Sequence, residues 1–170
     1  MKLQLTDWMP TEPDFELFHV YCHQKDYRLC FALNQQFGFN LSRRRDRFEI
    51  LEKDNETEEE KRKRLSTITY PQLEFVDEVI HREIFVVSNQ ANPIAKEFAT
   101  VVQGDLFSTD EQLPLLIPEL QKVDYFLQIY GQVSDAELNE IENQLNLIPL
   151  INAAKRVDPC SHPAYLNLMH

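Results

Sequence analysis

The feature that most constrains the fold is a strand–helix–strand pattern in residues 123–157. Residues 123–131 (VDYFLQIYG) predict a strand, because apolar side chains recur at every second position and would share one face of a sheet. Those side chains are Val123, Tyr125, Leu127 and Ile129. Ser134 and Glu137 have the spacing of a capping box that begins a helix. The apolar face of this helix comprises Leu138, Ile141, Leu145 and Ile148, and Pro149 ends it before a closing strand at 150–157 (LINAAKRV).

Residues 15–51 predict a second unit of the same kind. Its first strand, 15–23 (FELFHVYCH), is apolar or aromatic at nearly every position, as in a strand that is covered on both faces. Asp26 is the expected N-cap of the following helix, and Gly38 is the expected left-handed residue after its end. The inward stripe of this helix is Leu29, Cys30, Leu33 and Phe37. Residues 39–51 (FNLSRRRDRFEIL) predict the second strand.

Two further strands and one charged segment lie between these units. Residues 66–77 and 81–89 predict antiparallel strands, and Pro71 places the first of them near a sheet edge. Residues 52–64 contain no apolar side chain and predict an exposed charged excursion. Residues 92–104 fit either a short helix or a strand through FATVVQG.

Together these elements predict an α+β fold in a single domain, residues 1–170. Two βαβ units around antiparallel strands, with the helices packed on one face of a mixed sheet, favour a ferredoxin-like or ACT-like sandwich with an inserted charged hairpin. Residues 158–170 are then a C-terminal tail.

Composition excludes several classes of protein. Only three glycines occur, and neither G-x-G-x-x-G nor G-x-x-x-x-G-K-[ST] is present, so no cofactor is predicted. The three cysteines, Cys22, Cys30 and Cys160, make an odd count without paired spacing and fit a reducing compartment. No apolar run reaches the roughly 20 residues of a membrane span, and the first residues (MKLQLTDWMPTEPDFE) lack the apolar core of a signal peptide. The chain is therefore expected to be cytoplasmic and not to bind a membrane.

The net charge of −11 is unevenly distributed along the chain. Residues 41–64 hold nine of the seventeen Lys and Arg residues against eight acids, so the rest of the chain carries −12. An acidic body repels nucleic acid and anionic membranes over about 8 Å or more. Any anion-binding surface is therefore expected in 41–64. The candidate residues are Arg43, Arg44, Arg45 and Arg47, whose guanidinium groups match the geometry of phosphate.

Residues 117–125 read I-P-E-L-Q-K-V-D-Y. This stretch resembles the signature of the IPExxxVDY family of bacterial proteins at all six fixed positions, which are Ile117, Pro118, Glu119, Val123, Asp124 and Tyr125. The surrounding layout is similar too: an early helix begins D-Y-R-L, G-D-L-F precedes the signature, and a helix with I-P near its end follows. The resemblance covers residues 15–157. Because the family has no assigned activity, it implies a fold and not a reaction.

Two interpretations of the signature carboxylates are open. In the first interpretation, Glu119 and Asp124 form an acid–base pair, in which one carboxyl group has a raised pKa and the other is ionised. In the second, which is favoured, Pro118 fixes a bend, Glu119 lies in a turn, and Asp124 begins a strand, where carboxylates often accept turn N–H bonds. Asp124 and Tyr125 would also point to opposite faces of a strand. The signature is therefore predicted to be structural, and no catalytic residue is predicted.

A metal site is suggested by His19, Cys22 and His23 but is not predicted. On a strand, His19 and His23 share a face but stand ~13 Å apart, and Cys22 faces the other way. A structural zinc ion needs four convergent ligands. Further ligands from elsewhere in the chain would be His81, or Cys160 and His162 in the tail.

The favoured function is that of a small non-catalytic binding or regulatory module of the cytoplasm, with an unknown ligand. A protein partner is expected. This partner can be a second copy of the chain, docked through the apolar strand at 66–77, because exposed sheet edges must be covered or paired. The alternative is a nucleic-acid or ribosome-associated protein, binding RNA through the basic segment 43–64. An enzyme that uses Glu119 or Asp124 ranks third.

Overall fold

The computed structural model describes residues 13–44, 70–92 and 114–168 of the 170. Within these ranges six strands form one sheet in the order β2-β3-β4-β5-β1-β6, and every neighbouring pair is antiparallel. The strands are β1 (Phe15–Tyr21), β2 (Ser42–Arg43), β3 (Gln72–Asp77), β4 (Arg82–Ser88), β5 (Tyr125–Tyr130) and β6 (Ala153–Val157). The α-helices are α1 (Asp26–Phe37) and α4 (Asp135–Leu147), and the 3-10 helices are η1 (Pro118–Leu120) and η2 (Pro163–Leu168).

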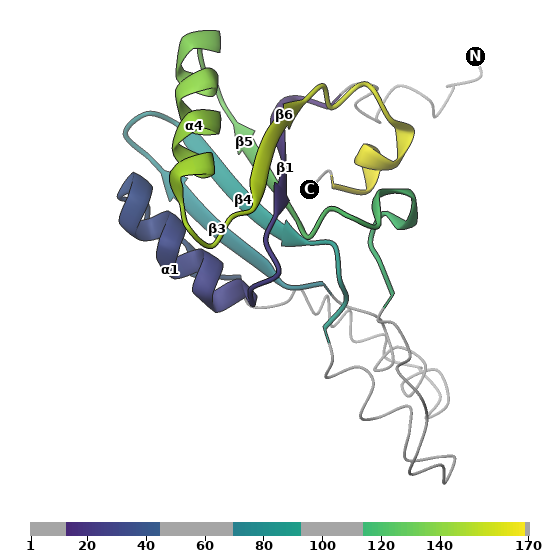
Figure 1. Cartoon of the computed structure of the whole chain (residues 1–170). Coiled ribbons are helices and arrows are strands. Elements are labelled where there is room, and N and C mark those ends of the chain that lie inside the picture. The colour runs from purple at the N-terminus through teal and green to yellow at the C-terminus, as the bar shows by residue number, and fades with distance from the viewer. Residues whose placement is uncertain (1–12, 45–69, 93–113, 169–170) are drawn as a thin grey trace, which may run out of the picture.

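Both α-helices cover the same face of the sheet, as Figure 1 shows. β1 lies between β5 and β6 and is antiparallel to both, so β5 and β6 run in the same direction and α4 connects them. The strand–helix–strand pattern predicted for 123–157 is therefore confirmed, with the first strand of the chain inserted between its two strands. The α+β class is confirmed as well, but the prediction of a mixed sheet is wrong for the described strands, because every neighbouring pair is antiparallel.

The helix-facing side of the sheet forms the larger core cluster. Leu29 and Leu33 of α1 and Leu138 and Leu145 of α4 are all buried. The strand residues in the same cluster include Phe18, Val20, Ile84, Val86, Leu127 and Ile129. Full burial of such a leucine stabilises the fold by roughly 1.5–3 kcal/mol relative to an exposed one, and these four side chains hold both helices on the sheet.

The opposite side of the sheet is buried by irregular segments. Its cluster consists of Phe15, Leu17 and Phe126 from the strands, Ile117 and Val123 beside η1, and Tyr165 and Leu168 from η2. β1 is therefore covered on both faces, which confirms the prediction from the nearly continuous apolar sequence of 15–23. Residues 158–168 of the predicted tail lie against this face of the sheet (Figure 1).

One asparagine side chain ties each α-helix to the segment that follows it. In the first unit the Leu41 N–H donates to Asn34 Oδ1 (2.8 Å), and Asn34 Nδ2 donates to the Leu41 carbonyl (3.1 Å). In the second unit Asn146 makes the same two bonds to Ala154 of the edge strand β6 (2.8 and 3.0 Å). Each side-chain amide makes the two hydrogen bonds that a residue of a neighbouring strand would make. Asn146 therefore covers part of the outer edge of β6.

β2 is much shorter than the sequence predicts. It comprises Ser42–Arg43, whereas a strand is expected over 39–51. Leu41 does not extend it, because both of its backbone groups are bonded to Asn34. Outside the described residues lie 45–51, the predicted excursion 52–64 and all but the first residue of the ambiguous segment 92–104.

The second unit also differs from its predicted limits. The prediction that Val123 shares a face with Tyr125 is wrong, because the two side chains lie in clusters on opposite sides of the sheet. The Val123 N–H closes a turn on the Leu120 carbonyl (3.0 Å), so this residue precedes the strand and does not follow its alternation. β6 begins at Ala153, three residues later than predicted, because a turn through Ile151 comes before it.

The sequence predicts the C-terminal end of α1 correctly but not its N-cap. Gly38 has a left-handed conformation (φ 69°) and donates its N–H to the Asn34 carbonyl (3.0 Å), as predicted. The N-cap is Lys25 and not Asp26, which is the first helical residue. Asp26 accepts the N–H of Tyr27 (2.9 Å), and its negative charge in the first turn still favours the helix.

Replacing Gly131 by alanine is expected to destabilise the fold more than replacing Gly38. Both glycines have positive φ (103° and 69°), which costs an alanine roughly 1–2 kcal/mol. A Cβ at Gly131 would also lie 2.8 Å from the His81 carbonyl oxygen, whereas a Cβ at Gly38 meets nothing within 4 Å. We expect Gly131→Ala to lower the free energy of unfolding, measured in urea, by at least about 1 kcal/mol more than Gly38→Ala. Equal losses would show that the turn at His81 yields without cost.

Candidate functional site

The signature residues form the turn that leads into β5. Pro118–Leu120 make the one-turn helix η1, and Pro118 stands in its first turn, where a missing N–H costs little. Ile117 and Val123, on either side of it, are buried in the cluster opposite the α-helices. Glu119 is exposed. The signature thus consists of two core anchors around an exposed turn.

Asn89, which no sequence pattern singles out, holds this turn from the end of β4. Its side chain is buried. Its Oδ1 accepts the Ile117 N–H (2.8 Å), and its Nδ2 donates to the carbonyls of Leu120 (3.0 Å) and Val123 (2.9 Å). Its backbone N–H donates to the Asp124 carbonyl (2.9 Å). One buried residue therefore satisfies polar backbone groups at both ends of the signature turn.

Asp124 and Tyr125 bind the connection between β1 and α1. Asp124 Oδ2 accepts the N–H of Cys22 at 2.7 Å, across 102 positions of the chain. The Asp124 backbone N–H donates to the Val20 carbonyl (3.2 Å). The Tyr125 hydroxyl donates to the Gln24 carbonyl at 2.6 Å. The last two signature residues therefore fix where β1 ends and how the chain enters α1.

Burial keeps the neighbouring titratable groups in their protonated forms. Burial raises the pKa of Tyr125, and the negative charge of Asp26 adds to the effect, so the hydroxyl remains a donor at neutral pH. Burial also raises the pKa of the Cys22 thiol. Because the thiolate and not the thiol is the reactive form, this cluster is suited to hydrogen bonding and not to nucleophilic attack.

Glu119 and Asp124 have different surroundings. Glu119 is exposed in η1. The Asp124 carboxylate is partly buried, where it binds the Cys22 N–H and lies 3.6 Å from Nδ1 of His23. In the part of the chain that the structure describes, no hydrogen bond or ion pair joins the two carboxylates. This geometry lends no support to an acid–base pair.

Asp124→Ala is expected to lower the free energy of unfolding by about 1–3 kcal/mol, because it leaves the buried Cys22 N–H without an acceptor. Glu119→Ala removes the other signature carboxylate and is the matched control, with an expected change within about 0.5 kcal/mol. Urea denaturation measures both. If the two variants lose the same stability, the bond from Cys22 to Asp124 has no special importance.

Asn89→Ala is expected to be the more damaging substitution, with a loss of about 3 kcal/mol or more, because three side-chain hydrogen bonds to backbone groups disappear together. Asn139→Ala changes an exposed asparagine of α4 and is expected to stay within about 0.5 kcal/mol. An Asn89→Ala variant that unfolds at the wild-type urea concentration would contradict the role of this side chain.

The histidines and cysteines considered for a metal site are dispersed. His19 is buried, and its Nε2 lies 2.9 Å from the Tyr165 hydroxyl. Cys22 is buried, whereas the side chain of His23 is 79% exposed. Among residues 13–44, 70–92 and 114–168, no group of three or more His, Cys, Asp or Glu side chains is placed to hold a metal ion.

The predicted anion-binding arginines are only partly described, since Arg45 and Arg47 lie outside the described residues. Arg44 forms an ion pair with Glu74 (Nε to Oε2, 3.2 Å), and its guanidinium carbon lies 5.7 Å from the centre of the Phe85 ring. Arg43 is exposed on β2. A carboxylate and an aromatic face thus already engage Arg44.

The end of β3 and the turn that follows it expose three large apolar side chains. We define the hairpin tip as residues 76–81. Within it Val76 is 50% exposed, Val79 is 89% exposed and Ile80 is 54% exposed. From the sequence alone, this turn is only the connection between two predicted strands. The available signal is the run V-D-E-V-I, which places Val79 and Ile80 where short polar residues are usual. Exposed apolar groups gathered on one projection are typical of a contact surface.

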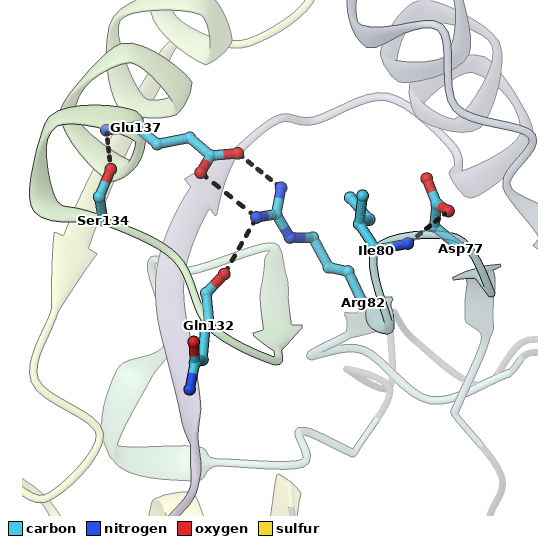
Figure 2. Close-up of polar contacts among 6 residues, drawn as sticks. All are labelled: Asp77, Ile80, Arg82, Gln132, Ser134 and Glu137. Carbon is cyan, nitrogen blue, oxygen red and sulfur yellow. Dashed lines mark hydrogen bonds and ion pairs between the residues drawn. The ribbon is translucent and has the colours of Figure 1, made fainter.

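Local hydrogen bonds and a close backbone approach fix the shape of the hairpin tip. Asp77 Oδ1 accepts the N–H groups of Val79 (2.9 Å) and Ile80 (3.3 Å), and Figure 2 shows the second bond. His81 has a positive φ of 50°, which is uncommon for a residue other than glycine. Its carbonyl oxygen lies beside Gly131, so the tip packs directly on the connection from β5 to α4.

Arg82, the first residue of β4, ties the hairpin tip to α4 (Figure 2). Its terminal nitrogens lie 2.5 and 3.2 Å from the two carboxylate oxygens of Glu137, and one also donates to the Gln132 carbonyl (3.1 Å). Ser134 is the N-cap of α4 as predicted, because its Oγ accepts the Glu137 N–H (3.3 Å). The Glu137 carboxylate binds Arg82, where the capping box predicts a bond to the Ser134 backbone. The tip is therefore braced by a bidentate, charge-assisted pair.

A hollow of about 590 Å³ lies where the start of β1 meets the end of β6. Its charged lining is Asp14, Glu16, Arg156 and Asp158. Arg156 donates to Glu16 (3.0 and 3.2 Å) and to Asp135 (2.9 Å), and the bond to Asp135 raises the pKa of the guanidinium group. Arg156 is thus already paired with two carboxylates, so the hollow is a weaker candidate for a functional site than the hairpin tip.

No protein-family model, no curated protein and no solved structure matches the chain. The resemblance to the IPExxxVDY family therefore stays a prediction that depends on residues 117–125. In the described part of the chain, no helix is long and apolar enough to cross a membrane.

Proposed function

We propose that the protein is a non-catalytic binding module that contacts another protein through the hairpin tip. The observation that carries this proposal is the exposure of Val76, Val79 and Ile80 at the end of a β-hairpin that is braced from two sides. Covering apolar surface contributes roughly 25 cal/mol for each Å² removed from water. Because the turn is ordered before binding, little of this gain is lost to conformational entropy.

The internal use of the signature supports a non-catalytic function. Asp124 and Tyr125 direct their polar atoms to the backbone of Cys22 and Gln24. Asn89 directs its amide to the signature turn. Polar atoms that are bound to the backbone in this way are not presented to a substrate, so the signature is better suited to holding the fold that displays the tip.

The charges around the hairpin tip suggest the chemistry of the partner. Asp77 and Glu78 lie within the tip, and the exposed Glu83 follows on β4. The cation of Arg82 is already paired with Glu137. We therefore propose that the partner is a protein with an apolar groove rimmed by Lys or Arg, toward which the net charge of −11 would steer this chain.

The same proposal includes a cytoplasmic location, a ferredoxin-like or ACT-like architecture and membership of the bacterial IPExxxVDY family. The odd cysteine count supports a reducing compartment. The β5-α4-β6 unit with β1 between its strands supports the ferredoxin-like architecture. The signature at 117–125 supports the family.

A nucleic-acid or ribosome-associated function is the alternative. It depends on the basic segment 43–64, of which the structure describes Arg43 and Arg44. Because Arg44 is engaged by Glu74 and Phe85, this proposal has less support than the hairpin tip. Phosphate binding of this kind would weaken steeply as salt rises, whereas contact through an apolar tip would not.

A second copy of the chain is the competing protein partner. β2 pairs with only two residues of β3, Leu73 and Glu74, so no described strand covers the outer edge of β3 beyond them. Leu73 is buried, and Phe75 stacks on Phe39 with 5.4 Å between ring centres. Val76 is therefore the exposed apolar side chain that a two-fold contact at this edge would cover.

A photo-cross-linking residue introduced at position 79 is expected to capture the partner in the host cell. The same residue at Leu147 is the control, because Leu147 is also largely exposed but lies at the far end of α4. The expected result is a cross-linked protein that is found with position 79 and absent with position 147. A product of twice the chain mass of 20.1 kDa would identify a second copy, and a nucleic-acid product would favour the alternative.

The captured protein, once purified, is expected to bind the Val79→Ser/Ile80→Ser variant at least about tenfold more weakly than the wild type, because lost apolar contacts on this scale cost on the order of 1.4 kcal/mol or more. Leu147→Ser is expected to bind as the wild type does. These exposed substitutions should change stability by no more than about 0.5 kcal/mol, so a lower affinity reports the contact itself. If position 79 captures nothing that position 147 does not also capture, the proposal is wrong.

A further inference from the structure

Residues 158–168, which we call the C-terminal strap, lie across the face of the sheet opposite the α-helices (Figure 1). The strap ends in η2, and its Tyr165 and Leu168 are buried. They belong to the same apolar cluster as Leu17 of β1 and Phe126 of β5. The strap therefore covers apolar side chains that the sheet would otherwise present to water.

Two hydrogen bonds join side chains of the sheet to the strap among the described residues. His19 Nε2 on β1 lies 2.9 Å from the Tyr165 hydroxyl, and Gln128 Nε2 on β5 donates to the Leu168 carbonyl (2.8 Å). The Oε1 atom of Gln128 is buried and meets no donor in the described part of the chain. Closing the strap over Gln128 thus leaves a polar atom unsatisfied, which weakens the attachment.

The surroundings of His19 disfavour a positive charge. The side chain is 6% exposed, and its ring packs edge-on against Phe126 and Tyr165, with 5.6 and 5.8 Å between ring centres. β6 places Lys155 directly opposite His19 in the strand register. Lys155 of β6 lies opposite His19, and Tyr165 of the strap contacts its ring. The next titratable groups are His162 of the strap and Tyr21 of β1, which lie beside Tyr165. None of these four side chains is a carboxylate that could pair with a protonated ring.

We propose that protonation of His19 releases the C-terminal strap and uncovers the apolar face of β1 and β5. With the strap closed, a proton on the imidazole would place a cation in an apolar site opposite Lys155. With the strap open, water reaches the ring and stabilises the same charge. The open form therefore binds the proton more tightly, and acid shifts the population toward it. This device does not involve the hairpin tip and can be tested separately.

The pKa of His19 is consistent with this geometry, because burial first and Lys155 second lower it from its usual value. A histidine with a lowered pKa contributes its full stability above the pKa of the exposed ring, about 6.5. That contribution is lost as the pH falls from there to the lower pKa of the closed form. Strap release is therefore expected below about pH 6.5 and not above it.

Hydrogen exchange on the full chain tests the release. Protection factors of the amides in 164–168, corrected for the intrinsic effect of pH, are expected to fall between pH 7.5 and pH 5. The fall is up to about tenfold for each unit by which closure lowers the pKa of His19. Amides of β4 and β5 are expected to keep their protection. Equal protection of the strap at the two pH values, or a parallel loss throughout the sheet, would overturn the proposal.

Three variants identify the group that titrates. His19→Gln carries a neutral amide in place of the ring and is expected to abolish the pH response of the strap. Lys155→Gln removes the opposing cation and is expected to reduce it. His162→Gln, within the strap, is the control and is expected to leave it unchanged. A response that persists in His19→Gln, or that disappears in His162→Gln, would refute the role of His19.

One measurement needs no substitution at His19. If His19→Gln does not fold, an NMR titration of the wild-type histidines decides the matter. The midpoint of the His19 resonance is expected below 6.5, and strap protection is expected to fall between pH 6.5 and that midpoint. A His19 midpoint at or above 6.5, or a loss of protection outside this interval, would overturn the proposal.

Discussion

The buried side-chain amide of Asn89 holds the turn from which the chain enters β5. It bonds the N–H of Ile117 and the carbonyls of Leu120 and Val123, so the chain can make a tight turn between two buried residues without leaving their polar backbone groups unsatisfied. That turn sets where β5 begins. β5 is itself one of the two central strands of the sheet and pairs with both β1 and β4. A single amide therefore links the register of the sheet to the signature.

The two proposed functional features lie at different places on this sheet. The hairpin tip is rigid, because Arg82 binds Glu137 and the backbone of His81 packs against Gly131. The C-terminal strap is attached more weakly, through one tyrosine, one carbonyl and apolar contacts. A rigid tip retains its binding energy, whereas a weakly attached strap can respond to a single proton. The same fold thus provides one surface suited to contact and another suited to release.

Patterns with a short period along the chain were enough to predict most of the regular elements. α1, α4, β1 and β5 follow from local periodicity, and Gly38 and Ser134 mark helix ends as expected. Local patterns failed at turns: Val123 faces the opposite cluster, and Lys25 caps α1 in place of Asp26. In both cases the conformation of the connecting segment decides the outcome, and the pattern of the neighbouring strand or helix does not extend into it.

The α+β class, α1, α4 and the apolar faces of these two helices can be predicted from the sequence alone, because each depends on residues within one turn or one strand of each other. The roles of Asn89, Arg82 and His19 depend on contacts that form only in the folded chain. Their partners are 28, 55 and 146 residues away, and a polar side chain carries no local mark of the distant group that it will meet. The exposure of Val79 and Ile80 was decided in the same way, because a side chain stays in water only where the assembled chain brings no other surface to cover it.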